Sequence, residues 1–197
     1  MEVAVDVFKT RRKHLMDEMP GGIGILAGES LKGRNGDVDY AFRQNSDFYY
    51  LTGVDEPDCV LVLTPGSDRG NSHLFLRPKD PMRETWDGPM IGLEGALEEY
   101  GFDQAYPLDT LQKELPGLME GRSEVYFTPN RQDPFSQNVL DAMGDHRNRP
   151  KRKTPGPDRL MDLRAPLHRA RFIKSPEEVT WMRRAGEISA AGHREAM

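Results

Sequence analysis

Apolar residues in the first half of the chain recur with the spacings of one helix and three strands. Residues 5–19 have helical spacing, whereas residues 23–27 and 73–76 are short apolar stretches typical of strands. The run from Cys59 to Leu63 is apolar throughout, which predicts a central strand buried on both faces, and a Pro-Gly turn predicts that residues 73–76 pair back on it. The helix is expected to have an apolar and a basic face, formed by Phe8, Leu15 and Met19 and by Arg11, Arg12 and Lys13.

Helical and extended patterns also alternate in the second half of the chain. Helices are expected at residues 93–100, 108–119 and 133–143, and a strand at residues 124–128. Residues 47–51 are aromatic and expected to be buried. Strands that alternate with helices predict an α/β domain built in layers.

Polar stretches between these elements predict loops. Residues 28–36 are polar and rich in glycine, residues 77–89 are rich in proline and charge, and residues 146–157 are polar and basic. Residues 161–174 have the pattern of a connector, so residues 1–160 are expected to form one domain.

The end of the chain carries a clear helix start. Ser175, Pro176 and Glu178 stand where a capping box places its N-cap serine, its first-turn proline and its acid. Apolar residues then recur at helical spacing, namely Val179, Met182, Ala185, Ile188 and Ala191. The sequence reaches Met197 without a glycine cap or a proline stop, and an amphipathic helix needs a partner for its apolar face. Residues 175–197 are therefore expected to begin a further domain and to be cut short.

Composition and charge narrow the functional class. The 197 residues carry a net charge of -5 and are 30% charged and 37% hydrophobic, which allows a packed core and argues against nucleic-acid binding. No apolar run is long enough to span a membrane, and the acidic N-terminus lacks the pattern of a secretory signal. Cys59 is the single cysteine, so no internal disulfide forms and a reducing cytoplasm is the expected setting.

Two short motifs resemble cofactor or metal sites, but a turn and a solvated loop explain them better. Gly22, Gly24 and Gly28 follow a helix and enclose a strand, whereas a dinucleotide loop follows a strand and opens a helix, so a turn with close strand packing is expected. Asp37 and Asp39 lack the further ligands that a metal site needs, which favours a solvated loop.

The remaining reactive residues form no catalytic constellation either. Cys59 lies in an apolar run and is expected in the core rather than as a nucleophile. The five histidines have no metal-binding spacing, and the basic cluster from Arg147 to Lys153 is expected to be a solvated loop rather than a nucleic-acid contact or a nuclear address. The sequence therefore offers no catalytic residue and no metal ligand.

Two segments combine aromatic and polar residues. Residues 42–53 place three aromatic residues beside Arg, Gln, Asn and Ser, which predicts a core edge with a hydrogen-bonded turn at Asn45-Ser46. Residues 83–88 place Trp86 between charged residues in a loop. Trp86 either pins this loop to the core or forms an exposed aromatic platform at a cleft or interface, and the residues alone leave both open.

Three stretches in colinear order resemble the aminopeptidase P family, the Xaa-Pro aminopeptidases. They are residues 42–53 with Glu56-Pro57, residues 75–96 with Trp86-Asp87-Gly88, and residues 171–197 with the capping box. Prolidases and creatinase share the two-domain plan of this family, but the Trp86-Asp87-Gly88 segment favours aminopeptidase P.

The resemblance implies a two-domain metalloenzyme that removes the N-terminal residue from a peptide whose second residue is proline. Residues 1–160 would be its N-terminal domain, a mixed β-sheet flanked by helices, and residues 161–174 the connector. Residues 175–197 would be the truncated start of a catalytic domain with the pita-bread fold. That domain would hold two divalent metal ions, commonly manganese, on two Asp, one His and two Glu.

No position of this sequence matches those five ligands, so no metal ligand is carried over and the chain alone is expected to be inactive. The N-terminal domain would wall the substrate cleft and mediate oligomer contacts, with Trp86 as its candidate site residue. The expected partners are its own catalytic domain, further copies in a homo-oligomer, and peptides with proline at the second position; no nucleic acid or membrane is expected.

A second hypothesis is a stand-alone, catalytically dead protein-binding module of the same fold. The coding sequence beyond Met197 separates the two. An open frame that encodes the five metal ligands supports the enzyme, whereas a stop codon supports the binding module.

Overall fold

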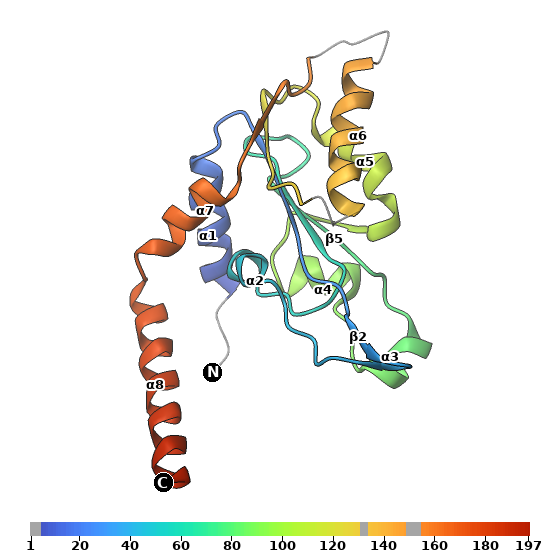
Figure 1. Ribbon diagram of the computed structural model, residues 1–197. Coiled ribbons are helices and arrows are strands. Elements are labelled where there is room, and N and C mark those ends of the chain that lie inside the picture. Colours follow the sequence, from blue (N-terminus) through green and yellow to red (C-terminus); the bar gives the residue numbers. More distant parts are fainter. Residues whose placement is uncertain (1–4, 131–133, 149–154) are drawn as a thin grey trace.

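The computed structural model describes residues 5–130, 134–148 and 155–197, and its main element is a six-stranded sheet (Figure 1). The strands are β1 (Ile23–Ala27), β4 (Val60–Leu63), β5 (Ser72–Leu76), β6 (Gln104–Pro107), β7 (Glu124–Tyr126) and β8 (Arg159–Met161), in the order β6-β5-β4-β1-β7-β8. Strand β4 pairs antiparallel with β1 and β5, whereas the β5·β6, β1·β7 and β7·β8 pairs are parallel. The expected mixed sheet is confirmed.

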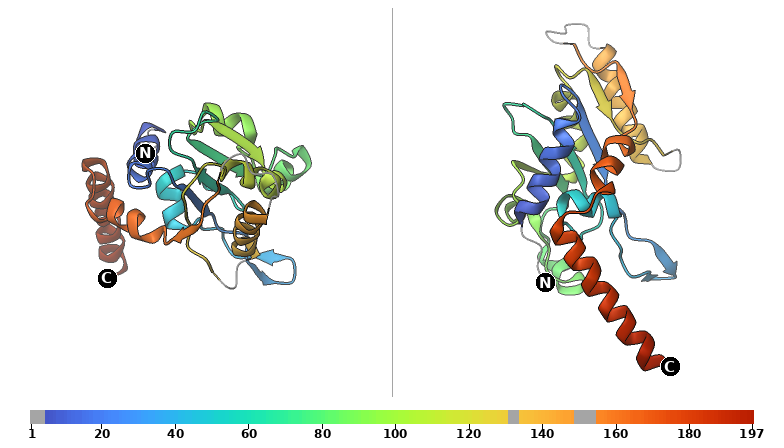
Figure 2. Two further views of the ribbon diagram at one scale, coloured as in Figure 1. Left: turned by 90° about the horizontal axis from the view of Figure 1, so that it is seen from above. Right: turned by 90° about the vertical axis from the view of Figure 1, so that its left-hand side faces the viewer.

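Helices cover both faces of the sheet, as the two further views in Figure 2 show. They are α1 (Val5–Asp17), α2 (Ser46–Thr52), α3 (Pro81–Asp87), α4 (Gly92–Glu98), α5 (Leu111–Leu118) after a 3-10 turn η1 (Leu108–Thr110), α6 (Pro134–Asn148), α7 (Arg164–Phe172) and α8 (Pro176–Ala196). The expected α/β fold with a sheet between helices is therefore confirmed. Among the described residues, no helix is both long enough and apolar enough to cross a bilayer.

Side chains of β4 alternate between two apolar cores. Leu61 and Leu63 pack with residues of α1, α2, α4 and α7, whereas Val60 and Val62 pack with residues of α5 and α6. None of these four side chains is more than 4% exposed. The prediction of a strand buried on both faces is therefore confirmed. Burial of each of these side chains contributes about 1.5–3 kcal/mol to the free energy of folding.

Close backbone packing explains the glycines near β1. A Cβ on Gly22 would lie 2.7 Å from the ring of Tyr126, and a Cβ on Gly24 would lie 2.9 Å from Cε of Met19. A side chain at either position would force its neighbour to move, which supports the expected turn and close strand packing.

Two segments expected to be loops contain short regular elements. Residues 28–36 include β2 (Gly33–Asn35), which pairs antiparallel with β3 (Val38–Asp39) through a turn at Gly36, whose φ is 57°. Residues 77–89 include α3, so the prediction of a loop around Trp86 was wrong. The turn expected at Asn45-Ser46 is the start of α2.

The C-terminal half departs from expectation in its element boundaries. Helix α7 lies within residues 161–174, which were expected to be a connector. Strand β8 crosses the expected border at residue 160 and extends the sheet beyond β7. Helix α6 runs to Asn148, into the expected surface loop. Most of the basic cluster, residues 149–153, lies outside the described residues.

Helix α8 projects away from the sheet and its covering helices (Figure 1). Ser175 Oγ accepts from the backbone N of Glu178 over 3.3 Å, and Glu178 Oε2 accepts from the backbone N of Ser175 over 2.8 Å. The predicted capping box is therefore present. No residue of α8 is buried, and its apolar face is open, with Met182 60% and Ile188 59% exposed.

The prediction of a basic face on the first helix was wrong for Arg12, which is buried. Arg12 is 2% exposed, and its guanidinium donates to the carbonyl oxygens of Leu51, Tyr100 and Gly101 over 3.1, 3.3 and 2.9 Å. Its Cζ lies 4.3 Å from the ring centre of Phe102, and burial lowers the pKa of Arg12 to about 10. The carbonyl acceptors explain why a charged residue is tolerated there.

Candidate functional site

Trp86, the site residue expected from the sequence, projects from α3 into solvent. Asp80 caps this helix, because its Oδ1 accepts from the backbone N of Met82 over 3.0 Å and of Arg83 over 3.5 Å. Pro81 fits the first turn, where no donor is needed. Trp86 is 87% exposed and Met82, one turn earlier, is 79% exposed. Within this chain Trp86 therefore does not pin its segment to the core.

Polar contacts that do not involve Trp86 order the chain after α3 and tie it to the domain. Glu84 Oε1 accepts from the backbone N of Met90 over 2.9 Å, and the Glu56 carboxylate accepts from the backbone N of Ile91. Burial raises the pKa of Glu56, while this hydrogen bond opposes the rise. The chain that follows α3 is thus tied to the domain at Ile91, while the indole of Trp86 stays exposed.

Gln44 gives the segment 42–53 a structural role. It is 5% exposed, its Oε1 accepts from the backbone N of Glu29 and of Asn45 over 2.7 and 2.9 Å, and its Nε2 donates to the carbonyl oxygen of Glu56 over 2.8 Å. Asn45 caps α2 by accepting from two backbone N–H groups of its first turn, over 2.9 and 3.1 Å. The polar residues of this segment hold loops and a helix end in place.

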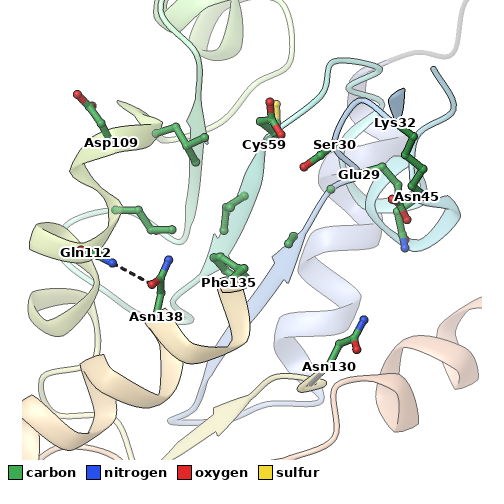
Figure 3. Close-up of a pocket in the computed structure, with 16 residues that line it drawn as sticks. Glu29, Ser30, Lys32, Asn45, Cys59, Asp109, Gln112, Asn130, Phe135 and Asn138 are labelled. Atoms are coloured by element: carbon green, nitrogen blue, oxygen red, sulfur yellow. Dashed lines mark hydrogen bonds and ion pairs between the residues drawn. The ribbon is translucent and has the colours of Figure 1, made fainter. Parts of the chain in front are cut away.

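A cleft of about 810 Å³ lies where β1 ends and β4, α5 and α6 begin (Figure 3). Ligands of open α/β sheets commonly bind at the carboxyl ends of strands. Gln112 Nε2 donates to Asn138 Oδ1 over 2.8 Å across one side of the cleft, and Lys32 pairs with Glu29 over 3.1 Å on another. Its other polar lining residues include Ser30, Asn45, Asp109 and Asn130.

The cleft offers hydrogen bonds but no activated nucleophile among its described lining residues. Cys59 is 1% exposed, and burial raises the pKa of its thiol to about 12. A thiol with that pKa stays protonated at neutral pH and is a poor nucleophile. The prediction that Cys59 belongs to the core is confirmed.

Metal-binding residue types do not gather in the part of the chain that the structure describes. No group of three or more His, Cys, Asp and Glu side chains that could hold an ion occurs among those residues. Asp37 and Asp39 are exposed at the β2–β3 hairpin. His73 is buried, with Nε2 2.8 Å from Thr64 Oγ1 and 3.1 Å from the carbonyl oxygen of Gly70. The resemblance places its two-metal site in the catalytic domain, and the described residues offer no group that would hold such ions.

Arg11 lies where three helices meet, which the sequence pattern did not predict. Its Nη1 donates to the carbonyl oxygen of Tyr50 over 3.1 Å, and its Nη2 donates to Glu178 Oε1 over 3.1 Å. Its Cζ lies 4.1 Å from the ring centre of Tyr50. The side chains of Arg11 and Glu178 are 11% and 17% exposed. The two residues are 167 positions apart, so no local pattern signals the contact.

Known proteins similar to this chain include Xaa-Pro aminopeptidases. The aminopeptidase P N-terminal domain profile matches residues 8–126. The Xaa-Pro aminopeptidase of Escherichia coli K12 is 35% identical over 198 residues, which cover 100% of this chain and 45% of that protein.

Solved structures of such enzymes superpose on nearly the whole chain. Aminopeptidase PepP of Pseudomonas aeruginosa has a TM-score of 0.93 and 40% identity, covering 99% of this chain and 44% of its own. Aminopeptidase P of E. coli, solved with the inhibitor Pro-Leu and also zinc-substituted with product, has a TM-score of 0.89 and 34% identity over 98% of this chain and 44% of its own. The chain thus spans less than half the length of these relatives.

Proposed function

Because this chain belongs to the aminopeptidase P family, with the N-terminal domain of that family at residues 8–126, we propose that it is the non-catalytic domain of a metal-dependent Xaa-Pro aminopeptidase. The observation that carries the proposal is the coverage. The alignment with the E. coli enzyme covers 100% of this chain but only 45% of the enzyme. The reaction, removal of an N-terminal residue that precedes proline, would be performed by the remainder of the protein.

The proposal divides the chain into three parts. Residues 1–160 would form the N-terminal domain, and residues 175–197 the first helix of the catalytic domain. Residues 161–174 would be the connector, which is itself packed on the N-terminal domain, since Leu163 and Leu167 belong to its apolar core. The open apolar face of α8 supports this division, because an amphipathic helix of this kind draws most of its stability from a packing partner. The catalytic domain is therefore the first partner proposed for this chain.

Metal chemistry is assigned to the remainder of the protein. The described residues supply no cluster of metal-binding side chains, whereas a relative has been solved in zinc-substituted form. Two divalent ions, commonly manganese in this family, belong to the proposal for the whole enzyme. Its substrates would be peptides with proline at the second position, and the lone, unpaired Cys59 supports a cytoplasmic location.

Trp86 is proposed to serve substrate access or subunit contact. Its indole is 87% exposed on a short helix whose following chain is tied to the domain by the Glu56–Ile91 hydrogen bond. Tryptophan is over-represented among residues that dominate interfaces, since it buries a large area at low entropic cost. The N-terminal domain would in this way shape the substrate cleft and mediate contacts in a homo-oligomer.

Reading the coding sequence beyond the codon for Met197 tests the proposal. We expect an open frame that encodes two Asp, one His and two Glu in the order and context of the family's metal site. A stop codon directly after Met197 in the native gene would contradict the proposal and favour a stand-alone binding module of the same fold.

A further inference from the structure

The ion pair that joins α8 to the body of the protein lies in the first turn of this helix. Arg11 of α1 and Glu178 of α8 form it over 3.1 Å, and both side chains are largely shielded from solvent. The end of α7 and the linker to α8 are not held by apolar burial, because Phe172, the last residue of α7, and Ile173, the first residue of the linker, are 82% and 81% exposed. The direction of α8 therefore depends on contacts other than packing of this linker.

The two carboxylate oxygens of Glu178 serve different donors. Oε2 accepts from the backbone N of Ser175 over 2.8 Å and completes the capping box. Oε1 accepts from Nη2 of Arg11 over 3.1 Å. One side chain thus starts the helix and fastens that start to α1.

The guanidinium of Arg11 is itself fixed by α2. Its Nη1 donates to the carbonyl oxygen of Tyr50 over 3.1 Å, and its plane lies beside the Tyr50 ring, with Cζ 4.1 Å from the ring centre. Tyr50 in turn donates from its hydroxyl to the carbonyl oxygen of Ala170 in α7 over 3.1 Å, and Arg171 of α7 pairs with Asp47 of α2. A planar, fixed group that reaches several acceptors at once suits arginine rather than lysine.

We propose that Arg11 is a positioning residue that sets the direction in which α8 leaves the sheet domain, by holding the helix through Glu178. We call the Arg11–Glu178 contact the clamp. Because it lies at the base of a long helix, a small change in it has a large effect at the far end. Ser189 lies about 20 Å along the axis from Ser175 at 1.5 Å per residue, so a swing of about 20° moves it by about 7 Å. Arg11 thereby relates the orientation of whatever follows α8 to the sheet.

The consequence for catalysis rests on the proposed function, since α8 orients a catalytic domain only if such a domain follows. The direction of α8 can be measured without activity. A failure of the clamp and a failure of the proposed function are therefore distinguishable.

Pulsed electron spin resonance between two nitroxide labels tests the clamp in the 197-residue chain. Ser189→Cys in α8 and Lys113→Cys in α5 provide two exposed labelling sites. Cys59 is 1% exposed with a thiol pKa raised to about 12 by burial, so it escapes labelling at neutral pH. The distance distribution is then compared between the labelled parent, Arg11→Ala and Glu178→Gln. The glutamine keeps the side-chain length but supplies one carbonyl oxygen where the carboxylate supplies two.

We expect a shifted or broadened distribution in both variants, with displacements of several ångströms, and an unchanged far-UV circular dichroism signal. Lys13→Ala is the matched control, because it removes an exposed ion pair with Asp17 on the same helix α1 and should leave the distribution unchanged. An unaltered distribution in Arg11→Ala and Glu178→Gln would overturn the proposal. A change seen in Glu178→Gln alone and accompanied by a loss of helical circular dichroism signal would also overturn it, because Glu178 would then act only through the capping box.

Discussion

Arg12 of α1 donates from Nη1 to the carbonyl oxygen of Leu51, at the C-terminal end of α2, over 3.1 Å. Its neighbour Arg11 donates to the preceding carbonyl oxygen, that of Tyr50. The last carbonyl groups of a helix lack partners within it and carry partial negative charge, so two guanidinium groups satisfy and neutralise this end of α2. The two consecutive arginines thus fasten α1 to α2. Arg12, the more buried of the two, is expected to contribute more to the free energy of unfolding.

Arg12→Ala is expected to destabilise the domain strongly. The substitution leaves three buried or half-buried carbonyl oxygens without their donor and removes a side chain that is 98% covered. An unsatisfied buried polar group costs about 1–3 kcal/mol, so the free energy of unfolding should fall by at least about 2 kcal/mol. Urea unfolding measures this change.

Lys13→Ala serves as the control for Arg12→Ala. Its ion pair with Asp17 is exposed, and such pairs contribute at most about 1 kcal/mol. Equal, small effects of the two substitutions would contradict the role assigned to Arg12.

His73 should make stability depend on pH in a defined window. Burial lowers the pKa of His73 from 6.5 to about 4. Between these values the unfolded chain binds a proton that the folded chain does not, so the free energy of unfolding falls as pH drops through the window. The loss is absent above about pH 6.5 and approaches about 3 kcal/mol near pH 4.

Urea unfolding of the parent and of His73→Gln from pH 4 to pH 7 measures this contribution. Glutamine can still donate to Gly70 but does not titrate in this range. The difference in stability between the two proteins should change with pH in the stated direction. Parallel pH profiles would show that His73 does not titrate as its burial requires.

Trp86→Ala should leave the stability of this domain nearly unchanged. The side chain is 87% exposed, and surface substitutions usually change the free energy of unfolding by no more than about 0.5 kcal/mol. Phe48→Ala is the comparison, since Phe48 is fully buried and truncating a buried aromatic side chain costs about 3–5 kcal/mol. Thermal unfolding of both variants tests the contrast.

In a protein extended through the catalytic domain, Trp86→Ala should lower kcat/KM for an Xaa-Pro peptide or weaken the oligomer. Activity assays and sedimentation measure these two outcomes. A large loss of stability with normal activity per folded molecule would instead make Trp86 a packing residue.

Amides of α8 should exchange faster with solvent than those of β4. Backbone groups from Val179 to Ile188 belong to a helix without buried residues, whereas β4 is buried on both faces. Helices draw most of their stability from packing, so α8 should open more often. Hydrogen exchange read by mass spectrometry provides the comparison, and equal protection of the two segments in a monomeric sample would contradict it.

Sequence pattern predicted the parts of the fold that depend on local signals. The unbroken apolar run at β4 and the capping box at Ser175 each have a short-range cause, and both are present in the structure. The loop expected around Trp86 was wrong because Asp80 and Pro81 form an N-terminal cap that starts α3. That signal was available in the sequence but was obscured by the charge and proline content of the segment.

Contacts between distant residues could not be predicted in the same way. Arg11 and Arg12 have the spacing of a solvated face, and only the folded arrangement brings carbonyl oxygens of α2 and the carboxylate of Glu178 to them. The cleft in Figure 3 likewise joins side chains from loops and helices far apart in sequence. The family resemblance identified Trp86 as a site candidate, while its exposure came from the structure.

The central claim is that this chain is the non-catalytic part of an Xaa-Pro aminopeptidase. Its most direct test is release of the N-terminal residue from an Xaa-Pro peptide in the presence of manganese, measured for residues 1–197 and for the protein extended through the catalytic domain. The same peptide with alanine in place of proline is the substrate control. We predict no release by residues 1–197 and proline-dependent release by the extended protein. Turnover by residues 1–197 that persists after host peptidases are removed would contradict the account.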